Sequence, residues 1–343
     1  MTEIGSVMID LEGTTLQAAD RRRLEDIRVG GVILFSRNFQ DRRQLRALVA
    51  EVRAVRPAPL LIAVDHEGGR VQRFRDGFSK LPAMATLGAL HASQPSLARQ
   101  AAEDLGFVLA WELRTCGIDF SFTPVLDLDF GQSSVIGDRA FTRDPESAAE
   151  LAAALVRGLE AAGSSGIGKH FPGHGYPQAD SHLDLPVDPR PLAALAADDL
   201  VPFRQLAASL RGIMPAHVLY PACAPEPAGY SPFWLQQVLR GKLGFAGAVF
   251  SDDLAMVGAL GAGTPVARAQ AAFAAGCDMV LLCNDAPAVD TLLAELGDVQ
   301  RADGAGKRLA ALQGRILPER GAMQHLAAVL RLDQVALPGW ESA

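Results

Sequence analysis

Residues 60–65 read L-L-I-A-V-D, five apolar residues followed by a carboxylate. The run is rich in branched side chains and too short for a buried helix, and the H-E-G-G that follows contains two glycines that interrupt regular structure. Its lack of polar alternation predicts a strand that is buried on both faces, as strands of parallel sheets are.

The same pattern recurs seven more times along the chain. The other runs are S-V-M-I-D (6–10), G-V-I-L-F (31–35), D-F-S-F-T-P-V (119–125), G-I-G-K-H (166–170), G-I-M-P-A-H (212–217), A-V-F-S-D (248–252) and D-M-V-L-L-C (278–283). Stretches with helical spacing lie between them, around residues 17–27, 41–54, 96–115, 146–162, 192–208, 232–241, 265–275 and 286–296. Eight strands that alternate with helices predict an α/β fold, a (β/α)8 barrel of the TIM type. An open, doubly wound sheet is the alternative.

The length of 343 residues is large for one small core but suits one barrel-type domain. Residues from about 298 to 343 keep helical character after the eighth strand and helix. We therefore predict a single barrel domain over residues 1–343, with the last segment as a C-terminal helical extension.

Composition narrows the class of protein. No apolar run approaches the roughly 20 residues of a membrane helix, so we expect no membrane association. A net charge of -7 argues against nucleic acid as a partner. The start, M-T-E-I-G-S-V-M-I-D, lacks the basic and apolar regions of an export signal, which indicates a cytoplasmic protein. The four cysteines show no metal-type spacing and are expected to be reduced, and no segment points to an obligate protein partner.

Polar residues gather where the predicted strands end. They are Asp65, the P-V-L-D-L-D stretch (124–129), Lys169 with His170, His217, and Asp252 with Asp253. Because barrel enzymes build their sites at the carboxyl ends of the strands, we expect these side chains to face one mouth.

Asp252 and Asp253 invite different interpretations. An aspartate after a strand often caps the next helix, and Asp253 or Ser251 could have such a role. Asp252 can present its carboxylate to the barrel mouth, where it could attack an anomeric carbon as a covalent nucleophile.

The fifth strand leads into G-K-H-F-P-G-H-G-Y-P-Q-A-D-S-H (168–182), which is rich in titratable side chains. His170 and His174 have the spacing of a helical metal pair, but Pro172 and Gly173 between them disfavour a helix, so we predict no metal site. Lys169 could form a Schiff base with a carbonyl substrate, although a hydrogen-bonding role toward a polar ligand is favoured.

The end of the same stretch contains a potential proton donor. Asp180 and His182 are separated by one residue, a spacing that lets the carboxylate hold the imidazole and favour its protonated form. This pair is therefore a candidate general acid near neutral pH.

Several motifs together resemble those of glycoside hydrolase family three. They are K-H-F-P-G-H-G (169–175) with D-S-H (180–182), F-S-D-D-L-A-M (250–256), V-D-H-E-G-G-R-V-Q-R-F (64–74), V-I-G-D-R-A-F (135–141) and P-A-H-V-L-Y-P (215–221). Within the family the chain is similar to bacterial NagZ-type β-N-acetylglucosaminidases, from about residue 8 to about 290. The resemblance implies a (β/α)8 barrel that removes terminal N-acetylglucosamine with retention of configuration, without metal or cofactor.

The resemblance also implies roles for single residues. Asp252 would be the nucleophile, His182 the general acid and base, and Asp180 the residue that orients His182. The sugar-binding positions would be Asp65, Arg73, Arg139, Lys169 and His170. Two departures from the family pattern, His66 where glutamine is common and Thr142 after R-A-F, could tune the ligand fit.

The substrate implied by the resemblance is a muropeptide, in which N-acetylglucosamine is β-1,4-linked to 1,6-anhydro-N-acetylmuramic acid, and the process is peptidoglycan recycling. Three other activities stay open at the level of sequence. The same site could pass the sugar to phosphate, because a histidine donor does not repel that anion as a carboxylate would. A Schiff-base lyase centred on Lys169 and a noncatalytic sugar-binding barrel are the other two.

Overall fold

The structure, a computed structural model, describes residues 4–178, 185–297, 299 and 301–343. Its centre is an eight-stranded sheet in which all neighbours are parallel, in the order β6-β3-β2-β1-β10-β9-β8-β7. The strands are β1 (Val7–Ile9), β2 (Val29–Leu34), β3 (Leu61–Val64), β6 (Phe120–Ser121), β7 (Ile167–Phe171), β8 (Gly212–Pro215), β9 (Ala248–Asp253) and β10 (Met279–Leu282). Each lies within one of the eight predicted runs or overlaps it.

The two ends of the sheet meet. Val125, which follows β6, forms a parallel bridge with Lys169 of β7, and the Leu126 amide donates to the Lys169 carbonyl over 2.6 Å. The strands therefore close into a barrel, and the open doubly wound alternative is wrong.

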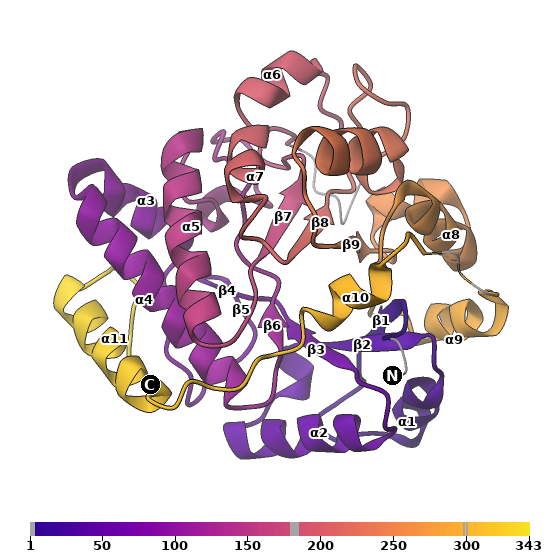
Figure 1. The fold of residues 1–343 in the computed structure, drawn as a ribbon, viewed down its shortest axis with the longest axis horizontal. Helices are drawn as coiled ribbons and strands as arrows, with labels where there is room; N and C mark the ends of the chain where they lie inside the picture. Colours follow the sequence, from indigo (N-terminus) through magenta and orange to yellow (C-terminus); the bar gives the residue numbers. More distant parts are fainter. Residues whose placement is uncertain (1–3, 179–184, 298, 300) are drawn as a thin grey trace.

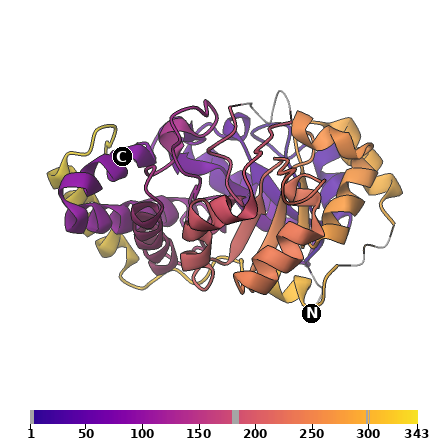
Figure 2. The same cartoon turned by 90° about the horizontal axis from the view of Figure 1, so that it is seen from above.

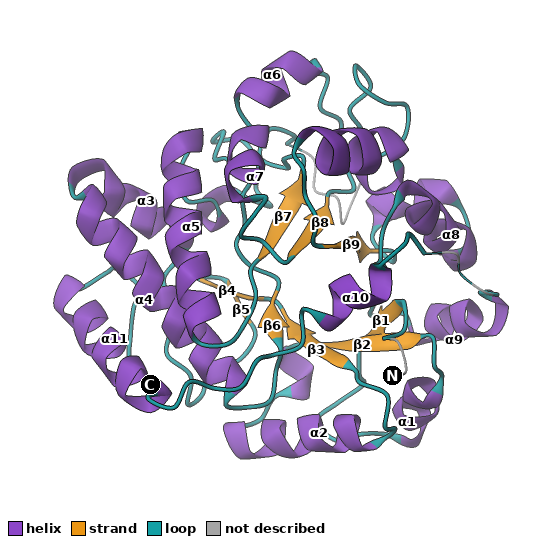
Figure 3. Ribbon diagram, in the orientation of Figure 1, coloured by secondary structure: helices purple, strands orange, loops and turns teal. Residues whose placement is uncertain are grey.

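Helices surround the barrel (Figure 1, Figure 3). They are α1 (Ala18–Glu25), α2 (Arg42–Ala54), α3 (Met84–Ser93), α4 (Pro95–Arg114), α5 (Pro145–Ala161), α6 (Leu192–Ala197), α7 (Leu200–Leu206), the π-helix η4 (Phe233–Lys242), α8 (Pro265–Ala275) and α9 (Ala286–Glu295), with 3-10 turns η1 (Ser36–Asn38), η2 (Gly137–Arg139), η3 (Ala228–Tyr230) and η5 (Val257–Ala262). The predicted helix over 192–208 is split into α6 and α7, and α3 was not predicted.

Several helices start at capping residues that the sequence provides. The side chains of Asp41, Asp144, Thr264 and Asp285 each accept a hydrogen bond from the backbone N–H three residues later. Such caps satisfy amides that have no partner within the helix, and so they fix where each helix begins after its loop.

The barrel interior is filled by apolar side chains from all eight strands, among them Met8, Ile33, Phe120, Phe250 and Leu281. The short helix α10 (Ala305–Ala310) closes the amino-terminal end of the barrel, where Leu309 and Leu312 join this cluster. Figure 2 shows α10 near the N-terminus at one edge of the molecule. The last helix, α11 (Gly321–Val335), packs against α4.

A hairpin of β4 (His66–Gly68) and β5 (Val71–Gln72) follows β3 and was not predicted as strands. Gly68 and Gly69 turn the chain with φ values of 115° and 55°, and a Cβ on Gly68 would lie 2.4 Å from the Pro82 carbonyl oxygen. Only glycine fits this turn without strain. The turn places Glu67 and Arg73 beside Asp65 at the barrel mouth.

Candidate active site

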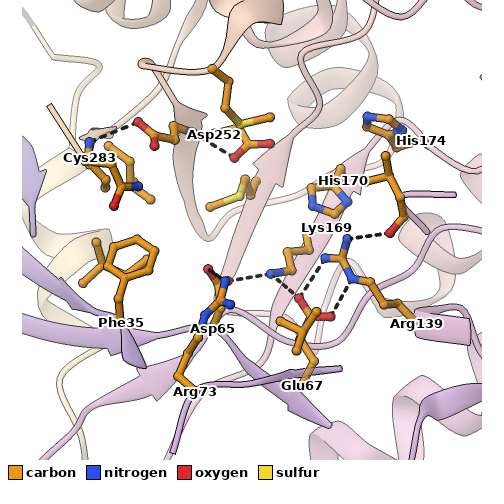
Figure 4. A pocket seen from close by; sticks show the side chains of 18 of the residues that line it. Phe35, Asp65, Glu67, Arg73, Arg139, Lys169, His170, His174, Asp252 and Cys283 are labelled. Atoms are coloured by element: carbon orange, nitrogen blue, oxygen red, sulfur yellow. Dashed lines mark hydrogen bonds and ion pairs between the residues drawn. The ribbon is translucent and has the colours of Figure 1, made fainter. Parts of the chain in front are cut away.

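A cavity of about 320 Å³ opens at the carboxyl ends of the strands. Its lining includes six of the eight predicted site residues, namely Asp65, Arg73, Arg139, Lys169, His170 and Asp252. They come from the β3–β4 junction, the end of the hairpin, η2, β7 and β9 (Figure 4). Asp65, Lys169, His170 and Asp252 thus share one mouth, as expected of strand-end residues, and the roles of all six stay predictions.

Side chains of alternating charge form a row of ion pairs along one side of the cavity. The Lys169 ammonium lies 2.8 Å from Asp65 Oδ1 and 2.6 Å from Glu67 Oε1. Arg139 donates from Nε and Nη2 to the two oxygens of Glu67, each over 2.8 Å. Arg73 Nη2 approaches Asp65 more loosely, at 3.7 Å. Figure 4 shows these side chains as one connected row.

The row keeps its buried groups ionised. Burial of Lys169 favours the neutral amine, but the carboxylates of Asp65 and Glu67 outweigh it and raise the pKa of Lys169. Burial likewise opposes the Glu67 carboxylate, yet Arg139 and Lys169 hold the pKa of Glu67 well below its usual range. A Schiff-base nucleophile needs a neutral amine, so the surroundings of Lys169 disfavour the lyase alternative.

His170 belongs to a second buried group. Its Nδ1 lies 2.7 Å from Asp127 Oδ2, and the backbone N–H groups of His170 and His174 also donate to this carboxylate. Burial opposes ionisation of Asp127, but His170 and these N–H donors outweigh it and lower its pKa. The carboxylate thus fixes the orientation of the His170 ring at the cavity wall.

Asp252 and Asp253 both line the cavity from β9, but they differ in environment. Burial of Asp252 disfavours its ionised form and so raises its pKa. His170, His217 and the N–H of Asp253 favour the carboxylate more strongly, so that the pKa of Asp252 is lowered overall. Asp253 Oδ1 instead accepts from the amides of Ala255 and Cys283, and burial raises the pKa of Asp253 to about 7. Asp252 is the ionised carboxylate of the pair, and Asp253 joins β9 to β10.

His217 and His66 need separate comment. His217 does not line the cavity, contrary to the expectation for strand six; it is fully buried beyond the end of β8, with its ring 5.5 Å from that of Tyr230. His66 also points away from the ligand side and packs against Phe74 and Phe78. The inward position of β8 is taken by Met214, which leaves His217 to pack against η3.

Asp180 and His182, the predicted acid–base pair, lie outside the described residues. The nearest described residues on either side are 178 and 185, and the Pro186 carbonyl is paired with the Leu219 amide over 2.9 Å. The roles of the pair therefore stay predictions.

Sequence reasoning gave Glu67 no role and expected Asp127, within P-V-L-D-L-D, at the mouth, whereas Asp127 bonds to His170 and does not line the cavity. Glu67 is 2% exposed and contacts two predicted site residues, and Asp127 is 1% exposed beneath His170. Both lie in stretches already noted for their motifs, H-E-G-G and P-V-L-D-L-D. A signal was available for each, since an ionised side chain beside a buried strand needs a partner.

Among the residues that the structure describes, no three or more His, Cys, Asp or Glu side chains are arranged to hold a metal ion. No helix in the described ranges is long and apolar enough to span a bilayer.

Known proteins resemble this chain over nearly its whole length. Residues 3–317 match the glycosyl hydrolase family 3 N-terminal domain. A beta-hexosaminidase of Nitrosospira multiformis is 56% identical over 317 residues, which cover 92% of this chain and 90% of the relative. A beta-hexosaminidase of Chromobacterium violaceum is 52% identical over 345 residues, with coverage of 98% and 97%.

The fold agrees with a solved structure, that of NagZ from Neisseria gonorrhoeae in complex with N-trifluoroacetyl-D-glucosamine. The two chains superpose with a TM-score of 0.92 at 47% identity, and the match covers 98% of this chain and 99% of that one. The chain therefore belongs to glycosyl hydrolase family 3, and it is a β-N-acetylhexosaminidase of the NagZ type.

Proposed function

We propose that this enzyme is a retaining exo-β-N-acetylglucosaminidase that removes the terminal N-acetylglucosamine of cytoplasmic muropeptides during peptidoglycan recycling. The observation that carries the proposal is the Asp252 carboxylate, ionised by its surroundings, in a polar cavity about large enough for one sugar. The volume of about 320 Å³ lies near the lower end of the roughly 300–1,000 Å³ of small-molecule sites. The gonococcal relative binds an N-acylated glucosamine, which supports an amino sugar as the occupant.

In the proposed first step, a carboxylate oxygen of Asp252 attacks the anomeric carbon. The bond from that carbon to the leaving oxygen breaks, and the oxygen takes a proton from the His182 imidazolium. In the second step water attacks the same carbon, neutral His182 accepts a proton from the water, and the Asp252 carboxylate leaves. Two inversions at one carbon retain the configuration.

The remaining residues would hold the sugar. Lys169, Arg139 and Arg73 are donors and Asp65 is an acceptor, so together they satisfy the hydroxyl and acetamido groups of a compact saccharide. The His170 ring, fixed by Asp127, adds a polar contact beside Asp252.

The test measures hydrolysis of nitrophenyl β-N-acetylglucosaminide by wild type and by Asp252→Asn. We expect the variant to lose at least about 1,000-fold in kcat/KM, since the covalent route is closed. Asp129→Asn is a control, because that carboxylate accepts only a turn amide from Gly131 among its described contacts. Full activity of Asp252→Asn would overturn the nucleophile assignment.

Three further measurements complete the test. Intact-protein mass spectrometry during turnover of a slow substrate should detect the enzyme with one N-acetylhexosaminyl group attached. NMR of the first-formed sugar should show the β anomer, whereas an α anomer would contradict retention. Phosphate added to the assay should neither raise the rate nor yield the sugar 1-phosphate; if it does, the phosphorolytic alternative is correct.

A further inference from the structure

Glu67 is the most fully enclosed charge of the cavity wall, and nothing above gives it a role in binding the sugar. Its carboxylate is 2% exposed and accepts three charge-assisted contacts, two from Arg139 at 2.8 Å and one from Lys169 at 2.6 Å. These contacts tie the β4–β5 hairpin to β7 and to η2, three elements that are distant in sequence.

We infer that Glu67 is the positioning residue of the sugar site: it holds the tips of Lys169 and Arg139 in the arrangement that receives the sugar. The inference rests on the proposed function, in which these two cations donate to the substrate. Glu67 acts through them and is not itself placed in contact with the reacting atoms.

The electrostatics of the wall explain why such a residue is needed. Lys169 and Arg139 repel each other, and the positive charge of Arg139 opposes protonation of Lys169. Both cations also feel the carboxylate of Asp65, and Arg139 feels that of Asp127. Without Glu67 the Arg139 guanidinium would have two other acids to turn toward. Glu67 therefore decides where the guanidinium points.

The geometry leaves donors for a ligand. Glu67 engages Nε and one Nη2 hydrogen of Arg139 in a bidentate pair, and the Val135 carbonyl takes a hydrogen of Nη1 at 3.2 Å. Lys169 gives one hydrogen to Glu67 and one to Asp65. A guanidinium has five N–H donors and an ammonium three, so fixed donors remain beyond these contacts. Donors held in place before binding cost little reorganisation when the sugar arrives.

The experiment compares Glu67→Gln with Glu112→Gln. Glu112 is a matched control: it is also 2% exposed and bonded to Ser79 and His325, but it lies on α4 and does not line the cavity. The probe is N-acetylglucosamine, whose inhibition constant reports binding without chemistry. We expect Glu67→Gln to weaken this binding about tenfold and to lower kcat/KM about 100-fold, while Glu112→Gln changes neither by more than about threefold.

A double-mutant cycle separates positioning from general stability. If Glu67 acts through Lys169 and Arg139, adding Glu67→Gln to Arg139→Gln costs clearly less in kcat/KM and in N-acetylglucosamine binding than Glu67→Gln costs the wild type, because only Lys169 is left to be positioned. Losses that simply multiply would overturn the inference. So would a Glu67→Gln variant that binds the sugar as tightly as Glu112→Gln does.

A second variant and a comparison with Asp252→Asn keep the outcomes distinguishable. If Glu67→Gln does not fold, Glu67→Asp retains the charge but cannot reach both cations, and it should show the same pattern with a smaller loss. If Asp252→Asn stays active while Glu67→Gln loses sugar binding, the proposed nucleophile fails and the positioning role stands. If instead Asp252→Asn is inactive and Glu67→Gln still binds the sugar normally, only the positioning role is contradicted.

Discussion

At the scale of single residues, Asp252 and Asp253 show how the backbone places two identical, neighbouring side chains in different surroundings. Asp252 points into a region of positive potential from His170 and His217, whereas Asp253 accepts amides of the β9 and β10 ends. The surroundings hold the pKa of Asp252 below its usual range, and burial raises the pKa of Asp253 to about 7. Neither difference follows from the sequence S-D-D-L alone.

The raised pKa of Asp253 predicts a pH dependence of stability. Between about pH 4 and pH 7 the folded protein keeps a proton on Asp253 that the unfolded chain has released, so the folded state binds more protons. The contribution of this group to the free energy of unfolding is therefore largest below pH 4 and is lost as the pH rises through 7. Asp253→Asn removes this contribution, and its amide oxygen can still accept both backbone N–H groups.

Urea unfolding at pH 5 and at pH 7.5 checks this prediction. Between these two values the wild type should lose more stability than Asp253→Asn, because titration elsewhere is common to both proteins. Equal changes in the two proteins would show that Asp253 titrates as in the unfolded chain.

Much of the candidate site could be read from the sequence because strand ends in a barrel converge. Asp65, Lys169, His170 and Asp252, which were expected at the mouth as strand-end residues, line one cavity. Arg73 and Arg139 line it too, but only the family resemblance pointed to them. The positions of Glu67 and Asp127 depended on a hairpin turn and on a partner some 40 residues away in sequence (127 to 170), and neither is a local property. The prediction that His217 faces the cavity was wrong, because the direction of this side chain depends on where β8 ends.

At the scale of elements, buried strands were predicted well because their apolar runs are uniform and bounded by glycine, proline or charge. Helix α3 was missed since its sequence, M-A-T-L-G-A-L-H-A-S, has apolar residues on all sides and no side-chain cap. The break between α6 and α7 also had no visible signal. It occurs at Asp198 and Asp199, which face the Arg143 and Arg190 guanidiniums, and Arg143 lies 55 residues from its partner Asp198.

The connection between β7 and α6 is held at both ends by Arg190. Its guanidinium lies 4.2 Å from the ring centroid of Tyr176 and forms ion pairs with Asp188 at 2.6 Å and Asp199 at 2.8 Å. Tyr176 precedes and Asp188 follows the positions of the proposed acid–base pair. A loss of this contact should therefore affect proton donation to the leaving group more than it affects sugar binding.

We predict that Arg190→Met lowers kcat/KM for an alkyl β-N-acetylglucosaminide at least about tenfold more than for the nitrophenyl one, whose leaving group needs little protonation. Arg143→Met is the control, because both guanidiniums lie over the Phe130 ring, at 4.0 Å for Arg143 and 4.8 Å for Arg190, but Arg190 alone of the two is seen over Tyr176. An equal loss on both substrates would argue that Arg190 serves stability only.

At the scale of the whole molecule, the two ends of the barrel have different tasks. At the amino-terminal end, buried carboxylates hold the covering segment in place. Asp278 pairs with Arg308 of α10, and Asp119 accepts hydrogen bonds from the Ile62 and Gly314 amides. The carboxyl end keeps its charges around an open cavity. Substitutions remote from that cavity should therefore change stability and leave catalysis intact.

Helix α11 offers the sharpest test of this division, because it packs on α4 and contributes no residue to the cavity. Leu332 is 0% exposed in the main core cluster, while Leu330 on the same helix is 52% exposed. Leu332→Ala should lower the free energy of unfolding by about 2–5 kcal/mol through lost burial and a residual cavity. Leu330→Ala should stay within about 0.5 kcal/mol of wild type. Measured well below the unfolding transition, both variants should keep the wild-type kcat/KM for the nitrophenyl substrate. A large drop in kcat/KM for folded Leu332→Ala would mean that α11 is coupled to the mouth of the barrel, which the packing gives no reason to expect.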